Sequence, residues 1–188
     1  NVYLNLFFLI TILISLGVPT FEWDARSIWL FNGKKIFYDN SIYVLFENYG
    51  EFSHNSYPVL TSAFAASLAL LAGYWNEVFP KIAFLFIFFP PLILVYSFMK
   101  GTTYLIFISI FLFIIGKFLF NGLVDGHIAL YFSIATLLMY LIFLSDEYLY
   151  KKPIHFILSI CFFSTLTLIK NEGLALLLLL FTTIFLIK

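Results

Sequence analysis

The chain has 188 residues, of which 63% are hydrophobic and 11% are charged. A soluble domain carries about 25% charged residues, so this sequence has too little polar surface to cover a globule in water. Ten basic and ten acidic residues give a formal net charge of zero, which excludes the basic footprint of a nucleic-acid-binding protein.

The apolar residues form long blocks instead of amphipathic stripes. The blocks cover residues 2–18, 58–75, 82–99, 102–120, 127–144, 154–169 and 174–187. Blocks of about 17–25 apolar residues match a hydrocarbon layer about 30 Å thick. A backbone in lipid satisfies its polar groups within helices, and the blocks lack the alternation of barrel strands. We therefore expect an all-α fold, a polytopic transmembrane helical bundle in which residues 1–188 belong to one domain.

The first connection, residues 19–57, is long and polar, whereas most of the others are short. Long connections in compact proteins are usually functional. Within it, residues 23–38 predict a helix lying at the membrane surface, with its aromatic rings at the interface. The i, i+3, i+4, i+7 spacing predicts one shared face on this helix for Asp24, Ser27, Ile28 and Phe31.

The path of block 58–75 decides which polar residues share a side of the membrane. If the block spans, Asp24 and Asp125 lie on opposite sides. If it is a re-entrant or surface helix, Asp24 and Asp125 share one side, and the lysines of the short loops lie on the other (Lys100, Lys151 and Lys152). We expect the second arrangement, because the positive-inside rule then makes the lysine side cytoplasmic and the long loop extracytoplasmic.

Two aspartates are candidates for catalysis. Asp24 could act as a general base on an acceptor hydroxyl. Asp125 is a lone acid in a short loop, and its expected position on the same side as Asp24 makes it a second candidate. Each could instead be a helix N-cap, a position where Asp is favoured. The sequence alone leaves both interpretations open.

The candidate substrate-binding residues are Arg26, His54, Tyr57, Lys170 and Glu172. Lys170 and Glu172 interrupt an apolar stretch, where ionisable groups are costly and often functional, so Lys170 could hold a lipid phosphate. They could equally form a surface turn as an ion pair. Arg26 could hold a phosphate, or pair with Glu22 four residues earlier.

No cluster of residues has metal-ligand spacing, so we predict no metal site from the residues, and a divalent cation stays open as a cofactor. The single cysteine, Cys161, lies inside an apolar block and excludes an internal disulfide. The chain starts at Asn1 and ends after an apolar run, and we therefore expect it to be a fragment of a longer protein.

Four short segments, taken in order, resemble a known family. They are EWDARSIW (22–29), HNSYPVL (54–60), VDGHIAL (124–130) and LIKNEGL (168–174). Their order and spacing are similar to those of the C-type membrane glycosyltransferases of family 39, which resemble dolichyl-phosphate-mannose-protein mannosyltransferases. Many members carry an Asp-Glu pair in the first loop. Here Ala25 follows Asp24, and the glutamate precedes it as Glu22.

The resemblance implies transfer of a sugar from a polyprenyl-phosphate donor to a lipid, glycan or protein acceptor on the extracytoplasmic side. It implies that Asp24 is the base, that Asp125 helps to shape the site, and that Lys170 handles the donor phosphate. The chain would be a multi-pass protein of a bacterial or archaeal plasma membrane, in contact with membrane lipid. Two other functions stay open: a transporter or flippase of lipid-linked sugars, and a membrane subunit without a catalytic site.

Overall fold

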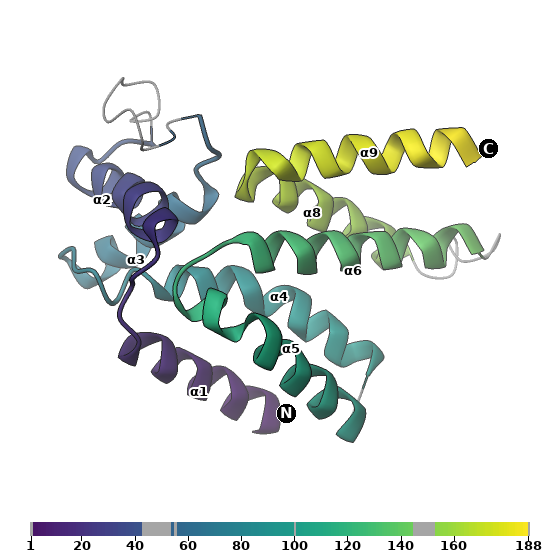
Figure 1. Cartoon of the computed structure of the whole chain (residues 1–188), viewed down its shortest axis with the longest axis horizontal. Helices are drawn as coiled ribbons and strands as arrows, with labels where there is room; N and C mark the ends of the chain where they lie inside the picture. The colour runs from purple at the N-terminus through teal and green to yellow at the C-terminus, as the bar shows by residue number, and fades with distance from the viewer. Residues whose placement is uncertain (1, 43–53, 55, 100, 145–152, 188) are drawn as a thin grey trace. The chain divides into compact units, whose positions relative to one another are not determined.

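The computed structural model describes the chain apart from residues 1, 43–53, 55, 100, 145–152 and 188 (Figure 1). Every regular element in the described part is a helix, so the all-α prediction is confirmed. Each of the apolar blocks corresponds to one helix, with bounds that differ by a few residues at most. The chain divides into two compact units, Asn1–Gly126 and His127–Lys188, and each is described by itself.

The first unit contains five α-helices and one π-helical turn among its described residues. They are α1 (Val2–Gly17), η1 (Ala25–Trp29), α2 (Leu30–Asp39), α3 (Leu60–Ala72), α4 (Ile82–Phe98) and α5 (Thr102–Phe120). Trp23 and Asp24 are already helical, so one continuous helix runs from residue 23 to 39, as the sequence predicts. The middle of this helix is η1, whose hydrogen bonds join each residue to the fifth along.

Helix α4 packs against both α1 and α5 and runs antiparallel to them (Figure 1). Phe89 of α4 stacks on Phe8 of α1 with ring centroids 4.1 Å apart. The neighbouring Phe88 packs against Phe111 of α5 with centroids 5.5 Å apart. Because α4 packs on two neighbours, its buried positions are mostly large and apolar, among them Phe84, Phe88 and Leu92.

Helices α2 and α3 pack closely because their contact is lined by small residues. A Cβ added to Gly33 would lie 3.0 Å from the Ser62 carbonyl oxygen and 3.3 Å from the Ala65 Cβ. Ala65, Ala66 and Ala69 are all buried in α3. Helix α3 has 13 residues, which corresponds to about 20 Å at 1.5 Å per residue.

The second unit contains the body of α6 (Asp125–Leu144), with α8 (Pro153–Ile169) and α9 (Asn171–Ile187). Ser159 of α8 donates its hydroxyl to the Ala135 carbonyl of α6 at 3.1 Å, and Tyr131 packs edge-on against Phe162. The turn from α8 to α9 is tight: a Cβ on Gly173 would overlap the Leu166 carbonyl, so only glycine fits there.

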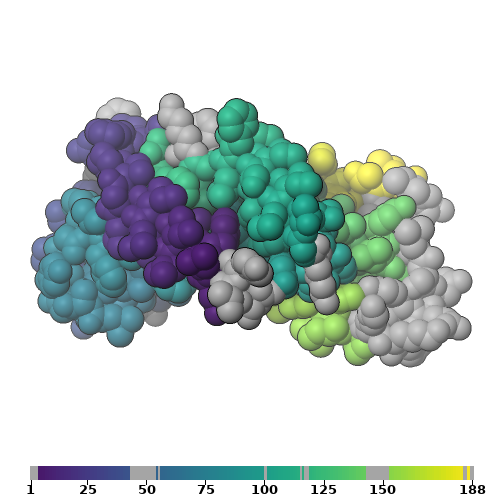
Figure 2. Space-filling view, turned by 90° about the horizontal axis from the view of Figure 1, so that it is seen from below, coloured from purple at the N-terminus to yellow at the C-terminus, as the bar shows by residue number. Residues whose placement is uncertain are grey.

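One described helix is long and apolar enough to cross a membrane, namely α6 over Asp125–Ile142. The other apolar stretches that the structure describes are 10–17 residues long. Many of the helices nevertheless carry large apolar side chains on their outer surfaces. Figure 2 shows α1, in purple, and α5, in green, side by side on one face. The large exposed apolar side chains of these two helices include Leu6, Leu9, Leu13, Ile106, Ile110 and Phe113.

Candidate functional site

Two hydrogen bonds gather three helix ends at one end of the first unit. The Lys81 ammonium, at the start of α4, donates to the Val18 carbonyl just after α1. The Asn121 amide, just after α5, donates to Glu22 Oε1 at 3.3 Å. Glu22 therefore pairs with the segment that follows α5. The pair of Glu22 with Arg26, which the sequence allowed, is not formed. The segment that carries Asp24 consequently meets the loop that leads to Asp125.

Gly122 brings these two loops into direct contact. Its φ of +84° lies in the region that favours glycine, and a Cβ there would stand 2.9 Å from the Ala25 Cβ. The same Cβ would lie 3.1 Å from the ring of Phe84. Ala25 follows Asp24 directly, and Asp125 is three residues beyond Gly122, so this close approach fixes the backbone beside both aspartates.

Asp24 is half-buried, and its carboxylate makes no capping hydrogen bond to the turn that follows. It has no ion-pair partner among the described residues. The capping role that the sequence left open is therefore not adopted. The π-helical turn begins at the next residue, and such turns occur frequently at functional sites.

The π-helical turn also changes which side chains share a face. Ile28 is buried in the core, whereas Ser27 and Phe31 face an open cavity. The predicted common face of Asp24, Ser27, Ile28 and Phe31 is therefore wrong for Ile28. The wider turn rotates the following residues relative to a regular α-helix, which a 3.6-residue period cannot anticipate.

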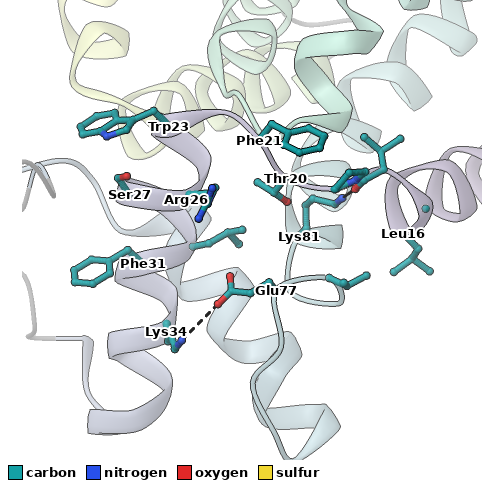
Figure 3. Close-up of a pocket in the computed structure, with 15 residues that line it drawn as sticks. Leu16, Thr20, Phe21, Trp23, Arg26, Ser27, Phe31, Lys34, Glu77 and Lys81 are labelled. Atoms are coloured by element: carbon teal, nitrogen blue, oxygen red, sulfur yellow. Dashed lines mark hydrogen bonds and ion pairs between the residues drawn. The ribbon is translucent and has the colours of Figure 1, made fainter.

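The cavity has a volume of about 1150 Å³ and lies against η1, the turn that follows Asp24 (Figure 3). Asp24 itself is not among the residues that line it. One wall is the end of α1 and the connection that follows it, from Leu16 to Phe21. A second wall is the helix that carries Trp23, Arg26, Ser27, Phe31 and Lys34. The third wall is the segment before α4, with Glu77 and Lys81. All three walls belong to the first unit.

Three bases and one acid line this cavity, which gives it a net charge of +2 when all four are ionised. Lys34 pairs with Glu77 at 3.5 Å, and Glu77 also accepts a hydrogen bond from the Trp75 indole at 3.2 Å. The Arg26 guanidinium is exposed and has no acceptor among the described residues. The hydroxyl oxygen of Thr20 is buried there, also without a hydrogen-bond partner in the described part.

Lys81 is the buried cation of this group, with about 1% of its surface exposed. The acceptor that its ammonium contacts is the neutral Val18 carbonyl. Burial without a neighbouring carboxylate lowers the pKa of Lys81, because desolvation disfavours the charged form. An anion in the cavity would supply the counter-charge that the protein itself does not provide.

Four aromatic rings form a continuous series beside the Asp24 turn. Trp23 meets His54 edge-on at 6.1 Å, His54 stacks on Tyr57 at 5.0 Å, and Tyr57 stacks on Trp29 at 5.5 Å. His54 and Tyr57 therefore lie against the helix that carries Asp24 and Arg26. These contacts explain how the return from the long loop is held, and neither residue lines the cavity.

The remaining candidates, Asp125, Lys170 and Glu172, do not line the cavity. Asp125 is exposed and is the first residue of α6, where the helix dipole favours a carboxylate, so its capping role stays open. In the second unit, Lys170 is mostly covered and pairs with Glu172 at 3.4 Å, which is the surface-turn interpretation. The lysines used to predict orientation, Lys100, Lys151 and Lys152, lie outside the described residues.

The sequence interpretation missed Lys81, Glu77 and Asn121. The available signal was weak: Lys81 stands immediately before an apolar block, and it resembles a snorkelling lysine at a helix end.

No family model, curated protein or solved structure matches the chain. Within the described ranges, no group of three or more His, Cys, Asp and Glu side chains could hold a metal ion.

Proposed function

We propose that this chain is part of a membrane-embedded glycosyltransferase that moves a sugar from a polyprenyl-phosphate donor to an acceptor hydroxyl. The proposal is carried by two features at one end of the first unit, a carboxylate and a basic cavity. Asp24, whose carboxylate makes no capping bond and has no ion-pair partner among the described residues, directly precedes the turn η1. That turn forms part of one wall of a cavity lined by Arg26 and Lys81, whose charges lack acidic partners among the described residues. Displacement of a lipid phosphate requires a base and an anion-binding site on neighbouring residues.

The exposed apolar side chains support embedding in a membrane. Soluble monomers rarely expose contiguous apolar patches larger than a few hundred Å². Here large apolar side chains are exposed on helices of both units, among them Leu13, Phe113, Ile157 and Leu179. Helices α4, α8 and α9 each have 17 residues, about 26 Å, which is close to the hydrocarbon thickness.

The arrangement of helix ends supports placing both aspartates on the same side. Because Lys81 contacts Val18, helix α4 begins at the end of the unit where α1 finishes. If α1 and α4 span, residues 18–81 lie on one side, and the short helix α3 does not cross. Asn121 contacts Glu22, so the loop before Asp125 lies on that side too. The positive-inside rule would make this side extracytoplasmic.

The proposed reaction is a direct displacement. The acceptor oxygen attacks the anomeric carbon of the sugar while the bond from that carbon to the phosphate oxygen breaks. The electron pair of that bond stays on the phosphate, and Asp24 takes the acceptor proton. The phosphodiester, with one negative charge, becomes a phosphate monoester with two. Arg26, Lys34 and Lys81 offset this increase in charge.

Replacing Arg26 with Gln in the full-length protein should lower kcat/KM for the donor about tenfold to a hundredfold. The reason is that one charge-assisted contact to the phosphate is lost. The measurement is transfer of a radiolabelled sugar from a polyprenyl phosphate in membrane vesicles. The matched control is Lys35→Gln on the same helix, because Lys35 pairs with Asp39 at 2.8 Å and does not line the cavity. Equal activities for the two variants would remove Arg26 from the donor site.

A further inference from the structure

The side chains that line the cavity carry more positive charge than a phosphodiester can neutralise. Arg26, Lys34, Lys81 and Glu77 leave a net charge of +2 when all four are ionised, whereas a sugar phosphodiester carries one negative charge. Asp24 is not among the lining residues and is not counted in this charge. A phosphate monoester has a second pKa of about 6 and therefore carries nearly two negative charges at pH 8. The released lipid phosphate thus matches the charge of the cavity better than the donor does.

The burial of Lys81 strengthens the attraction between its ammonium and an anion in the cavity. Its ammonium is covered by the protein and held by the Val18 carbonyl, so water screens it little. The acid of the cavity, Glu77, is already bound to Lys34 and to the Trp75 indole. The charge of Lys81 is therefore left for a ligand, and its attraction grows with the charge of that ligand.

Arg26 supplies the direct contacts that such a ligand needs, because its exposed guanidinium can contact two phosphate oxygens at once. Figure 3 shows Arg26 and Thr20 at the cavity, near Lys81. The Thr20 hydroxyl is buried and has no hydrogen-bond partner in the described part. Lys81 then acts behind these groups as a fixed charge.

We propose that Lys81 makes this cavity selective for a doubly charged lipid phosphate monoester over a singly charged phosphodiester. The identification of the monoester as the transfer product rests on the proposed function. The selectivity itself is a binding property and does not need transfer. The consequence for the enzyme is that the product is held more tightly than the donor, so that the released lipid phosphate inhibits competitively.

The test is equilibrium binding to the full-length protein in dodecyl maltoside at pH 8. The probes are decyl phosphate, methyl decyl phosphate and inorganic phosphate. Decyl phosphate should bind at least tenfold more tightly than its methyl diester. Inorganic phosphate should bind more weakly than decyl phosphate, and equal binding of the two would overturn the assignment to a lipid phosphate.

Two variants separate the role of Lys81 from general damage. Lys81→Met should reduce the preference for the monoester to threefold or less, while Lys35→Met should leave it unchanged. Glu77→Gln should strengthen monoester binding, because it frees Lys34 and raises the charge of the cavity; this variant gives a result even if Lys81→Met does not fold. Retained selectivity in folded Lys81→Met, or weaker binding by Glu77→Gln, would overturn the proposal. Absence of the monoester preference in a wild-type protein that transfers sugar normally would overturn this proposal and leave the proposed function standing.

Discussion

Replacing Asp24 with Asn in the full-length protein is expected to lower kcat for sugar transfer by about 10²–10⁴-fold, with little change in donor KM. General base catalysis contributes on this order, and an amide cannot accept the acceptor proton. The side chains have nearly the same shape. Because the Asp24 carboxylate makes no capping bond and has no ion-pair partner among the described residues, the fold should tolerate the change. The measurement is steady-state transfer at saturating donor.

The matched control is Asp39→Asn at the end of the same continuous helix. Its carboxylate pairs with Lys35 at 2.8 Å and lies at the opposite end of the helix from η1, so transfer should stay within about twofold of wild type. Normal transfer by an Asp24→Asn variant that is present in the membrane at wild-type amounts would exclude Asp24 as the base. A joint rise in KM and fall in kcat would indicate a binding role.

Replacing Gly122 with Ala is expected to lower the free energy of unfolding by about 2–5 kcal/mol and to reduce transfer. A side chain at positive φ costs about 1–2 kcal/mol, and overpacking adds about 1–3 kcal/mol. The overpacking arises because the new methyl group would stand 2.9 Å from the Ala25 Cβ and 3.1 Å from Phe84. Since Ala25 follows Asp24, the displaced backbone would carry the carboxylate with it. Thermal unfolding in detergent measures the first effect.

Gly73→Ala separates the two contributions. Gly73 has a φ of +79°, similar to that of Gly122, but no atom lies within 4 Å of an added Cβ. Gly73→Ala should therefore lower the free energy of unfolding only by the conformational cost, about 1–2 kcal/mol, and should retain transfer. Adding Ala25→Gly to Gly122→Ala should recover part of the loss, because it removes the nearer of the two contacts. Strictly additive effects of the two substitutions would show that the loops do not meet as described.

The helices could be predicted from the sequence because the apolar blocks are long and bounded by polar residues. The blocks 82–99 and 102–120 became α4 and α5 almost unchanged. The helix over residues 23–38 was also predicted from its spacing. Its π-helical turn was not, because a widened turn comes from tertiary contacts such as the one between Ala25 and Gly122. No local pattern encodes such a contact.

The candidate site was only partly accessible from the sequence, for the same reason. Asp24 and Arg26 stand out because charged residues are rare in this chain. Lys81 is 55 residues from Arg26, and only the packing of α1 against α4 brings it to the same cavity. The resemblance implied that Lys170 handles the donor phosphate, and the structure pairs Lys170 with Glu172 in the second unit, the alternative that the sequence left open. An acidic partner is present beside Lys170 and absent beside Lys81 among the described residues, a difference that residue type does not show.

The claim on which the rest depends is that the loops after α1 and α5 share one side of the membrane. It is tested by labelling single cysteines in intact cells with a membrane-impermeant maleimide, after replacing Cys161 with Ala. Ser27→Cys and Asp125→Cys should be labelled in intact cells, whereas Ser97→Cys, at the far end of α4, should be labelled only after permeabilisation. Labelling of positions 27 and 125 from opposite sides of the membrane would contradict the account.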